Sequence, residues 1–154
     1  MLEALLGTAA DRHADMVNIV SDLQDEALGW RPAEAASSMA GLVLHILHLE
    51  ATALSIAMGG AAEFGENGAG TEDFCSAVDL VAGIDRIQDE LGRTFRALSA
   101  SRLQAAQPGE ERTIAAMLVE EFDHAAMHYG QLQLTRHLWE AANPRAESSY
   151  SHWR

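Results

Sequence analysis

Residues 42–58 read LVLHILHLEATALSIAM, and this stretch decides how the rest of the chain is interpreted. It is apolar except for two histidines, His45 and His48, and one carboxylate, Glu50. A helix that is apolar on most of its sides usually lies at the centre of a bundle or at an interface. The stretch therefore predicts a central helix that carries an unusual pair of histidines.

Both ends of this predicted helix carry boundary residues. Ser37 and Ser38 precede it, and serine is a favoured N-cap residue because its hydroxyl accepts a hydrogen bond from a free backbone N–H. Gly59 and Gly60 follow Met58, and glycine commonly ends a helix. The predicted helix therefore runs from about residue 38 to Met58.

Three further segments show the spacing of three and four residues that is typical of helices. They run from about Leu2 to Leu28, from Asp73 or Ser76 to Leu98, and from an N-cap at Thr113 to Ala142, before Asn143-Pro144. The apolar face predicted for the first comprises Leu2, Leu5, Leu6, Ala9, His13, Met16, Val17, Val20 and Leu23. The face predicted for the third helical segment along the chain comprises Val78, Val81, Ile84, Ile87, Leu91, Phe95 and Leu98.

Four amphipathic helices of about 20–30 residues predict an all-α four-helix bundle. The glycine-rich connection over residues 59–72 is long enough to cross an end of the bundle, so a crossover connection is expected. We predict one domain over residues 1–142 and a C-terminal tail over 143–154.

Composition excludes several classes of protein. The formal net charge of −13 repels nucleic-acid backbones and anionic lipids, so no nucleic acid and no membrane partner is expected. The single cysteine, Cys75, excludes an intrachain disulfide and a cysteine-rich zinc site, and no histidine lies near it in sequence to activate it. No signal peptide and no apolar run of about 18–20 residues is recognised, which predicts a cytoplasmic protein. Nucleophile-elbow, Walker and H-E-x-x-H motifs are absent from the sequence.

His124 and His128 are the first candidate metal ligands. They stand at positions i and i+4 of the last helix, and this spacing stacks both rings on one face. Two imidazoles placed in this way can bind one metal ion. The H-x3-H pair alone is a weak signal, because chance surface placement gives the same spacing.

A third ligand can come from the central helix. A buried neutral histidine needs hydrogen-bond partners, or a metal can take that role. Two histidines in so apolar a stretch are hard to explain as solvent-facing, although either His45 or His48 can also be a satisfied core histidine. Glu50 can orient a ligand or pair with a buried base.

Other polar residues receive structural interpretations. His13 lies on the apolar face of the first helix and suits a structural hydrogen bond, and His137 suits the dipole at the end of the last helix. Glu121 lies one turn before His124, nearer the metal face, whereas Asp123 points away from it. Both carboxylates are expected to be solvated or ion-paired, and His152 in the tail carries no signal.

Two sequence blocks together resemble the DinB/YfiT-like metalloprotein superfamily. The first comprises Leu28-Gly29-Trp30-Arg31-Pro32, the stretch from Ser37 to Ile46, and Glu50. The second is the His124-x3-His128 pair followed by Tyr129-Gly130-Gln131. The resemblance spans about residues 1 to 142.

The resemblance implies a three-histidine metal site. It places the ligand of the second helix five residues before the glutamate, which selects His45 over His48, and it matches His124 and His128 to the other two ligands. Zinc or nickel is the usual ion, open positions remain for water or substrate, and dimers are frequent. Tyr129 stands where arginine is often found, which removes an expected contact to anionic substrates.

The resemblance also implies a range of activities. Characterised members include S-transferases and isomerases that use low-molecular-weight thiols, so thiol transfer to a small-molecule substrate is the expected chemistry. A metal-dependent hydrolase is an alternative. A second alternative is a non-catalytic metal-binding dimer, which a fourth protein ligand such as His13 or Glu121 would support.

Overall fold

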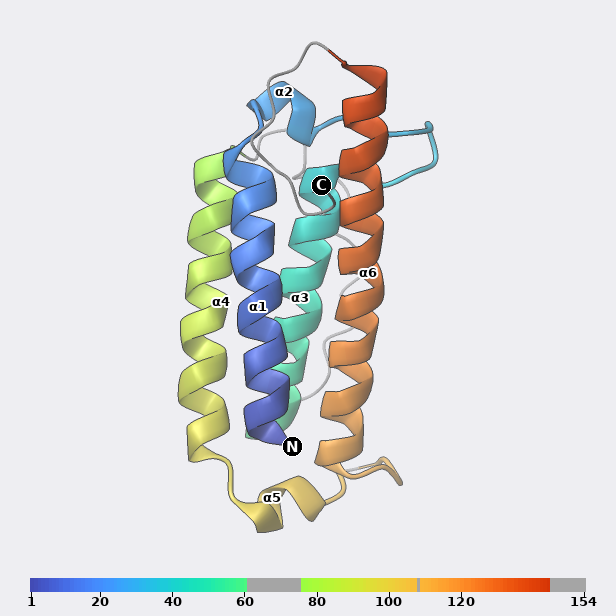
Figure 1. Cartoon of the computed structure of the whole chain (residues 1–154). Helices are drawn as coiled ribbons and strands as arrows, with labels where there is room; N and C mark the ends of the chain where they lie inside the picture. Colours follow the sequence, from blue (N-terminus) through green and yellow to red (C-terminus); the bar gives the residue numbers. More distant parts are fainter. Residues whose placement is uncertain (61–75, 108, 145–154) are drawn as a thin grey trace.

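The computed structural model describes residues 1–60, 76–107 and 109–144, and Figure 1 shows the arrangement of their helices. Four long helices form the bundle: α1 (Leu2–Ser21), α3 (Met39–Met58), α4 (Ala77–Ala97) and α6 (Ile114–Ala142). Two short helices, α2 (Asp25–Leu28) and α5 (Ala100–Gln104), lie between them along the chain. The prediction of an all-α four-helix bundle is confirmed. Cys75, His152 and most of the predicted tail lie outside the described residues.

The topology confirms the crossover connection. The most extensive contacts join α3 with α6 and α1 with α4, and α3 also packs against α4. In Figure 1, α1 and α6 run in one direction along the bundle, while α3 and α4 run in the other. Because α3 and α4 are parallel, the connection between them must join opposite ends of the bundle.

The central helix α3 begins and ends where its boundary residues predict. The Ser38 hydroxyl accepts a hydrogen bond from the Gly41 backbone N–H at 3.0 Å. Gly59 follows Met58 with a φ of 91°, the left-handed conformation that glycine adopts without steric cost. The N-cap of α6 is also confirmed, since the Thr113 hydroxyl accepts from the Ala116 N–H at 3.2 Å.

The prediction of one continuous first helix up to Leu28 is wrong. Helix α1 ends at Ser21, and α2 begins at Asp25 after Gln24 adopts an extended conformation. Leu23 and Leu28 are nevertheless buried, so the apolar spacing continues across the break. Residues 22–24 contain no glycine or proline, and the sequence therefore gave no signal that the helix stops there.

Val78 was predicted to be buried, and this prediction is wrong because its side chain is 77% exposed. The core face of α4 is centred on Leu80, Ile84 and Leu91, which are all buried. Val78 lies two residues before Leu80, so a helical turn of 100° per residue places it on the opposite side. Ser76 and Asp79 form a capping box that fixes the start of this helix.

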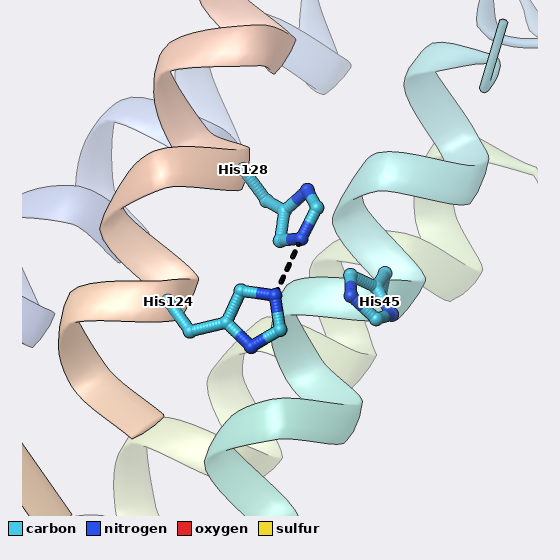
Figure 2. A group of neighbouring side chains, drawn as sticks. All are labelled: His45, His124 and His128. Atoms are coloured by element: carbon cyan, nitrogen blue, oxygen red, sulfur yellow. Dashed lines mark hydrogen bonds between the residues drawn. The ribbon is translucent and has the colours of Figure 1, made fainter. Parts of the chain in front are cut away.

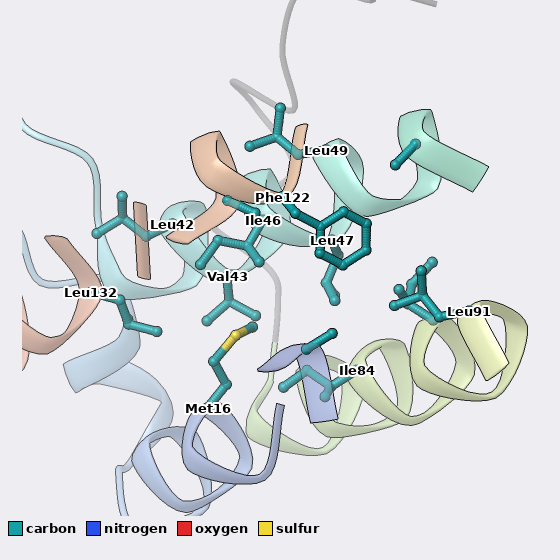
Figure 3. Close-up of a cluster of buried hydrophobic side chains, with 14 of the residues drawn as sticks. Met16, Leu42, Val43, Ile46, Leu47, Leu49, Ile84, Leu91, Phe122 and Leu132 are labelled. Carbon is teal, nitrogen blue, oxygen red and sulfur yellow. The ribbon is translucent and has the colours of Figure 1, made fainter. Parts of the chain in front are cut away.

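Side chains from all four long helices meet in one core (Figure 3). Met16 of α1, Val43 and Ile46 of α3, Ile84 of α4 and Leu132 of α6 are each almost completely buried. Burial of such a side chain contributes roughly 1.5–3 kcal/mol to folding. The core therefore fixes the position of α3 against α6, on which the site described below depends.

Helix α3 also corrects the expectation that no segment is apolar enough to span a membrane. Met39–Met58 has the length and hydropathy of a membrane span, but 72% of its apolar stretch is buried inside the protein. The core helix of a bundle can have the same length and hydropathy. Its hydropathy is accounted for by contacts with the other helices.

The short helix α5 was not predicted, and it closes the end of α3. Arg102 donates from Nε to the Ala57 carbonyl at 3.0 Å and from Nη2 to the Ile56 carbonyl at 3.3 Å. These carbonyls belong to the last turn of α3, where acceptors lack the usual partners four residues on, although the Ile56 carbonyl also accepts from the Gly59 N–H at 3.1 Å. The side chain of Arg102 thus supplies a C-terminal cap from a distant part of the chain.

Candidate metal centre

The three predicted ligands lie together between α3 and α6. Figure 2 shows His45 of α3 facing His124 and His128 of α6. Each histidine offers one ring nitrogen, and these nitrogens all lie within 4.8 Å of one another. The ring centroids of His45 and His128 are 4.4 Å apart. The structure therefore forms the group of three histidines that the sequence resemblance implied, and such a group can hold a metal ion.

The spacing of the two α6 histidines suits a single ion. The Nε2 atoms of His124 and His128 are 3.0 Å apart and share a hydrogen bond. Metal–nitrogen bonds of 2.0–2.1 Å in a tetrahedral arrangement separate two ligand nitrogens by about 3.3 Å. The two rings thus already stand close to the separation that one shared ion requires.

Gln131 orients the ring of His128. The Gln131 Oε1 atom lies 2.9 Å from His128 Nδ1 and accepts its hydrogen. This contact leaves the lone pair on Nε2, the nitrogen that faces His124. Gln131 was noted in the sequence only as part of a family block. Its position three residues after His128, on the same helix face, is the signal that would have identified the contact.

Burial and neighbouring charge both disfavour protonation of His45. Burial lowers the pKa of His45, and the positive charges that His128, His124 and His48 can carry lower it further. A metal ligand must offer a lone pair, so the imidazole has to be deprotonated. The environment of His45 therefore favours the protonation state that a metal ligand needs.

His48 does not join the cluster. Its side chain is exposed, which contradicts the expectation that neither histidine of α3 faces solvent. Ala51 and Met58 are exposed on the same side of the helix, at spacings of three and seven residues. Because Ala51 and Met58 are themselves apolar, the hydrophobic pattern of the sequence did not predict that this side of α3 faces solvent.

Glu50 and His13 belong to a separate buried network. Glu50 forms an ion pair with Arg12 through Oε1, and its Oε2 lies 2.5 Å from His13 Nε2. His13 Nδ1 lies 2.6 Å from Gln88 Oε1. Of the two roles left open for Glu50, the structure shows the pairing with buried bases. His13 has the structural hydrogen bonds expected of it and is not part of the three-histidine group.

Two carboxylates flank the site in different environments. Asp123 is exposed, as expected. Glu121 is half-buried, and its Oε2 atom is buried without a hydrogen-bond partner. Burial raises the pKa of the Glu121 carboxyl, and the positive charge of a protonated His124 opposes that rise. Glu121 departs from the expectation of a solvated or ion-paired side chain at Oε2 alone, because that oxygen is buried without a hydrogen-bond partner.

Tyr129 makes contacts with α1. Its hydroxyl donates a hydrogen bond to Asp15 Oδ2 and accepts one from Gln133 Nε2 at 2.7 Å. Tyr129 thus ties α6 to α1. The hydroxyl of Tyr129 therefore has a structural role in joining the two helices.

Comparison with known proteins identifies the family. The family model described as the DinB superfamily matches residues 9–132. The crystal structure of a DinB-like protein from Bacillus subtilis is similar, with a TM-score of 0.71, 18% sequence identity and coverage of 98% of this chain and 99% of that chain. At that identity the likeness concerns the fold alone. No curated protein matches the chain. Because the family model covers most of the sequence and all three clustered histidines, the chain belongs to the DinB superfamily.

Proposed function

We propose that His45, His124 and His128 hold one divalent metal ion, zinc or nickel. The observation that carries this proposal is the approach of their three ring nitrogens to within 4.8 Å of one another. Imidazole nitrogen suits both ions, and burial, which lowers the pKa of His45, favours the neutral donor. The hydrogen bond from His128 to Gln131 resembles the outer contacts that orient histidine ligands in metal sites.

The donor set supports an open centre. Structural zinc sites usually have four protein ligands, whereas catalytic sites have three and leave a position for water or substrate. Among the described residues, the group contains three histidines and no cysteine or carboxylate. His124 is exposed, so the group can be reached from solvent. An open, reachable centre favours an enzyme over a purely structural site.

We infer that the chemistry is thiol S-transfer between a low-molecular-weight thiol and a small-molecule electrophile. An ion held by three neutral histidines lowers the pKa of a bound thiol or water, which supplies a nucleophile at neutral pH. In the transfer, the thiol proton passes to solvent and the sulfur forms a bond to an electrophilic carbon. The leaving group departs with the electrons of the bond that breaks.

Hydrolysis is the second candidate, because the same open position accepts water in place of a thiol. The two reactions differ in the nucleophile and share the same three histidines. A non-catalytic metal-binding protein is the third possibility, and it needs no nucleophile at the ion.

The assay uses monobromobimane as the electrophile with several small thiols, and an ester substrate in parallel. We expect the metal-loaded protein to accelerate transfer with at least one thiol above the uncatalysed rate. The metal-free protein and the His128→Ala variant should not. Metal-dependent ester hydrolysis without thiol transfer would favour the hydrolase. The absence of any metal-dependent rate would contradict the enzymatic proposal and favour a non-catalytic metal-binding protein.

A further inference from the structure

Glu121 is an ionisable residue of the bundle whose partial burial is not explained by any hydrogen bond among the described residues. Its Oε2 atom is buried and has no hydrogen-bond partner, which is true of no other carboxylate oxygen in the described parts of the chain. Burial of a carboxylate oxygen without a partner is costly, since water that would solvate it has been removed. Such an atom calls for a partner that the described residues of the chain do not supply.

The surroundings of Glu121 indicate that the missing partner of its Oε2 atom would be bound at the histidine cluster. Glu121 precedes His124 by one turn of α6, so the two side chains lie on neighbouring positions of one helix face. The positive charges that His124 and His48 can carry act on its carboxylate and favour its ionised form against burial. A cation held at the cluster would act on the same carboxylate in the same direction and more strongly.

Among the residues that the structure describes, the cluster contains no anionic donor. Three neutral imidazoles leave the double positive charge of a divalent ion unbalanced. Glu50, the fully buried carboxylate of α3, already pairs with Arg12 and His13. Glu121, by contrast, is half-buried and lies one turn from His124 on α6. Its Oε2 atom makes no hydrogen bond among the described residues, so this carboxylate can balance the charge of an ion at the cluster.

Glu121 is not arranged as a ligand. The group of donor atoms within 4.8 Å of one another includes the three histidines and does not include this carboxylate. Its role beside the cluster is therefore electrostatic, and direct coordination would require the side chain to move.

We propose that Glu121 is a fourth functional residue of the metal centre, an anionic positioning residue that stabilises the bound cation without coordinating it. This inference rests on the proposed metal site. It explains why α6 keeps a buried carboxylate oxygen without a partner one turn from His124. The metal-free protein bears the cost of burying that oxygen, and the bound cation offsets it.

The test compares metal affinities, measured by competition with a chelator, for the full-length protein with zinc and with nickel. We expect Glu121→Gln to weaken binding by about 10–100-fold, the range seen when outer residues of metal sites are removed. Glu121→Asp keeps the charge and should lose less. The matched control is Asp123→Asn, which removes one charge from the exposed neighbour of His124 and should change affinity by less than about threefold because exposed charges are screened.

The same samples separate a role at the metal from a role in folding. The metal-free Glu121→Gln protein should melt at or above the temperature of the metal-free wild type, because a neutral amide costs less to bury than a carboxylate. A lower melting temperature together with weaker binding would assign the effect to folding and contradict the inference. Wild-type affinity in Glu121→Gln, with binding abolished in His124→Ala, would overturn the role of Glu121 and leave the three-histidine site intact. Absence of metal binding by the wild type would overturn the proposed site and this inference with it.

Discussion

Histidine has two distinct uses in this bundle, and the neighbouring residues decide which one applies. His13 is buried with a partner for each ring nitrogen, Glu50 on one side and Gln88 on the other. His124 and His128 instead direct nitrogens toward each other. Both ring nitrogens of His13 bond to side chains outside the histidine cluster, so His13 is a structural residue.

Removal of Glu50 should destabilise the fold and spare the metal site. Glu50→Ala leaves Arg12 buried without its carboxylate, and loss of one partner from a buried ion pair costs about 3–5 kcal/mol. Urea denaturation of the metal-free protein measures this loss. The exposed Glu90→Ala on α4 is the control and should change stability by less than about 0.5 kcal/mol. A folded Glu50→Ala protein that has lost its metal would show instead that Glu50 supports the ligands.

At the scale of the helices, local signals determined which boundaries the sequence could predict. Ser38 marks the start of α3 because its side chain accepts a hydrogen bond from a backbone N–H of the first turn. Gly59 marks the end because it adopts the left-handed conformation that ends many helices. No glycine or proline marks the break after Ser21, and the burial of Ala27 and Leu28 in α2 depends on tertiary packing. Helix α5 does carry a local signal, because it follows the N-cap Ser99, whose hydroxyl accepts a hydrogen bond from the Arg102 N–H at 3.2 Å.

The same distinction applies to the candidate site. The pair His124 and His128 could be predicted from spacing, because both lie on one helix. The choice between His45 and His48 depends on which side of α3 meets α6, and only the family resemblance made that choice before the structure did. The orphaned oxygen of Glu121 could not be foreseen, because it reflects packing around the side chain.

Arg102 should be important for the end of α3. Arg102→Ala removes a charged donor from two carbonyls in the last turn, and hydrogen bonds to charged groups contribute about 1.5–3 kcal/mol. Because the bonds are only partly buried, we expect a loss of about 1–3 kcal/mol in urea denaturation. The exposed Arg93→Ala variant on α4 is the control. Equal stability of the two variants would show that α5 does not brace α3.

For the whole molecule, the outer face of α6 is unusual for so acidic a chain. Met127, Leu134 and Leu138 are exposed at spacings of seven and four residues, which places them on one strip. Gly130 lies beside this strip, and a Cβ added there would meet no atom within 4 Å. Glycine in a helix costs roughly 0.5–1 kcal/mol relative to alanine, so its presence favours close approach by another molecule. Two chains of net charge −13 repel each other least where they meet through an uncharged strip.

We therefore predict a homodimer that pairs the α6 strips of two copies around a twofold axis. Leu134→Glu places a charge in the middle of the strip and should convert the dimer to a monomer in light scattering coupled to size exclusion. Val78→Glu adds the same charge at an exposed apolar position of α4 and should remain dimeric. A monomeric wild type, or a Leu134→Glu protein that is still dimeric, would contradict this interface.

The central claim is that three histidines of α3 and α6 hold one ion, and metal content per chain tests it most directly. The wild-type protein should contain close to one zinc or nickel ion per chain, measured by mass spectrometry of the metal. His45→Ala, His124→Ala and His128→Ala should each lose most of it. His48→Ala, a substitution of the exposed histidine one turn from His45, should keep it. Metal content that is unchanged in the first three variants, or that falls more in His48→Ala than in His45→Ala, would contradict the account.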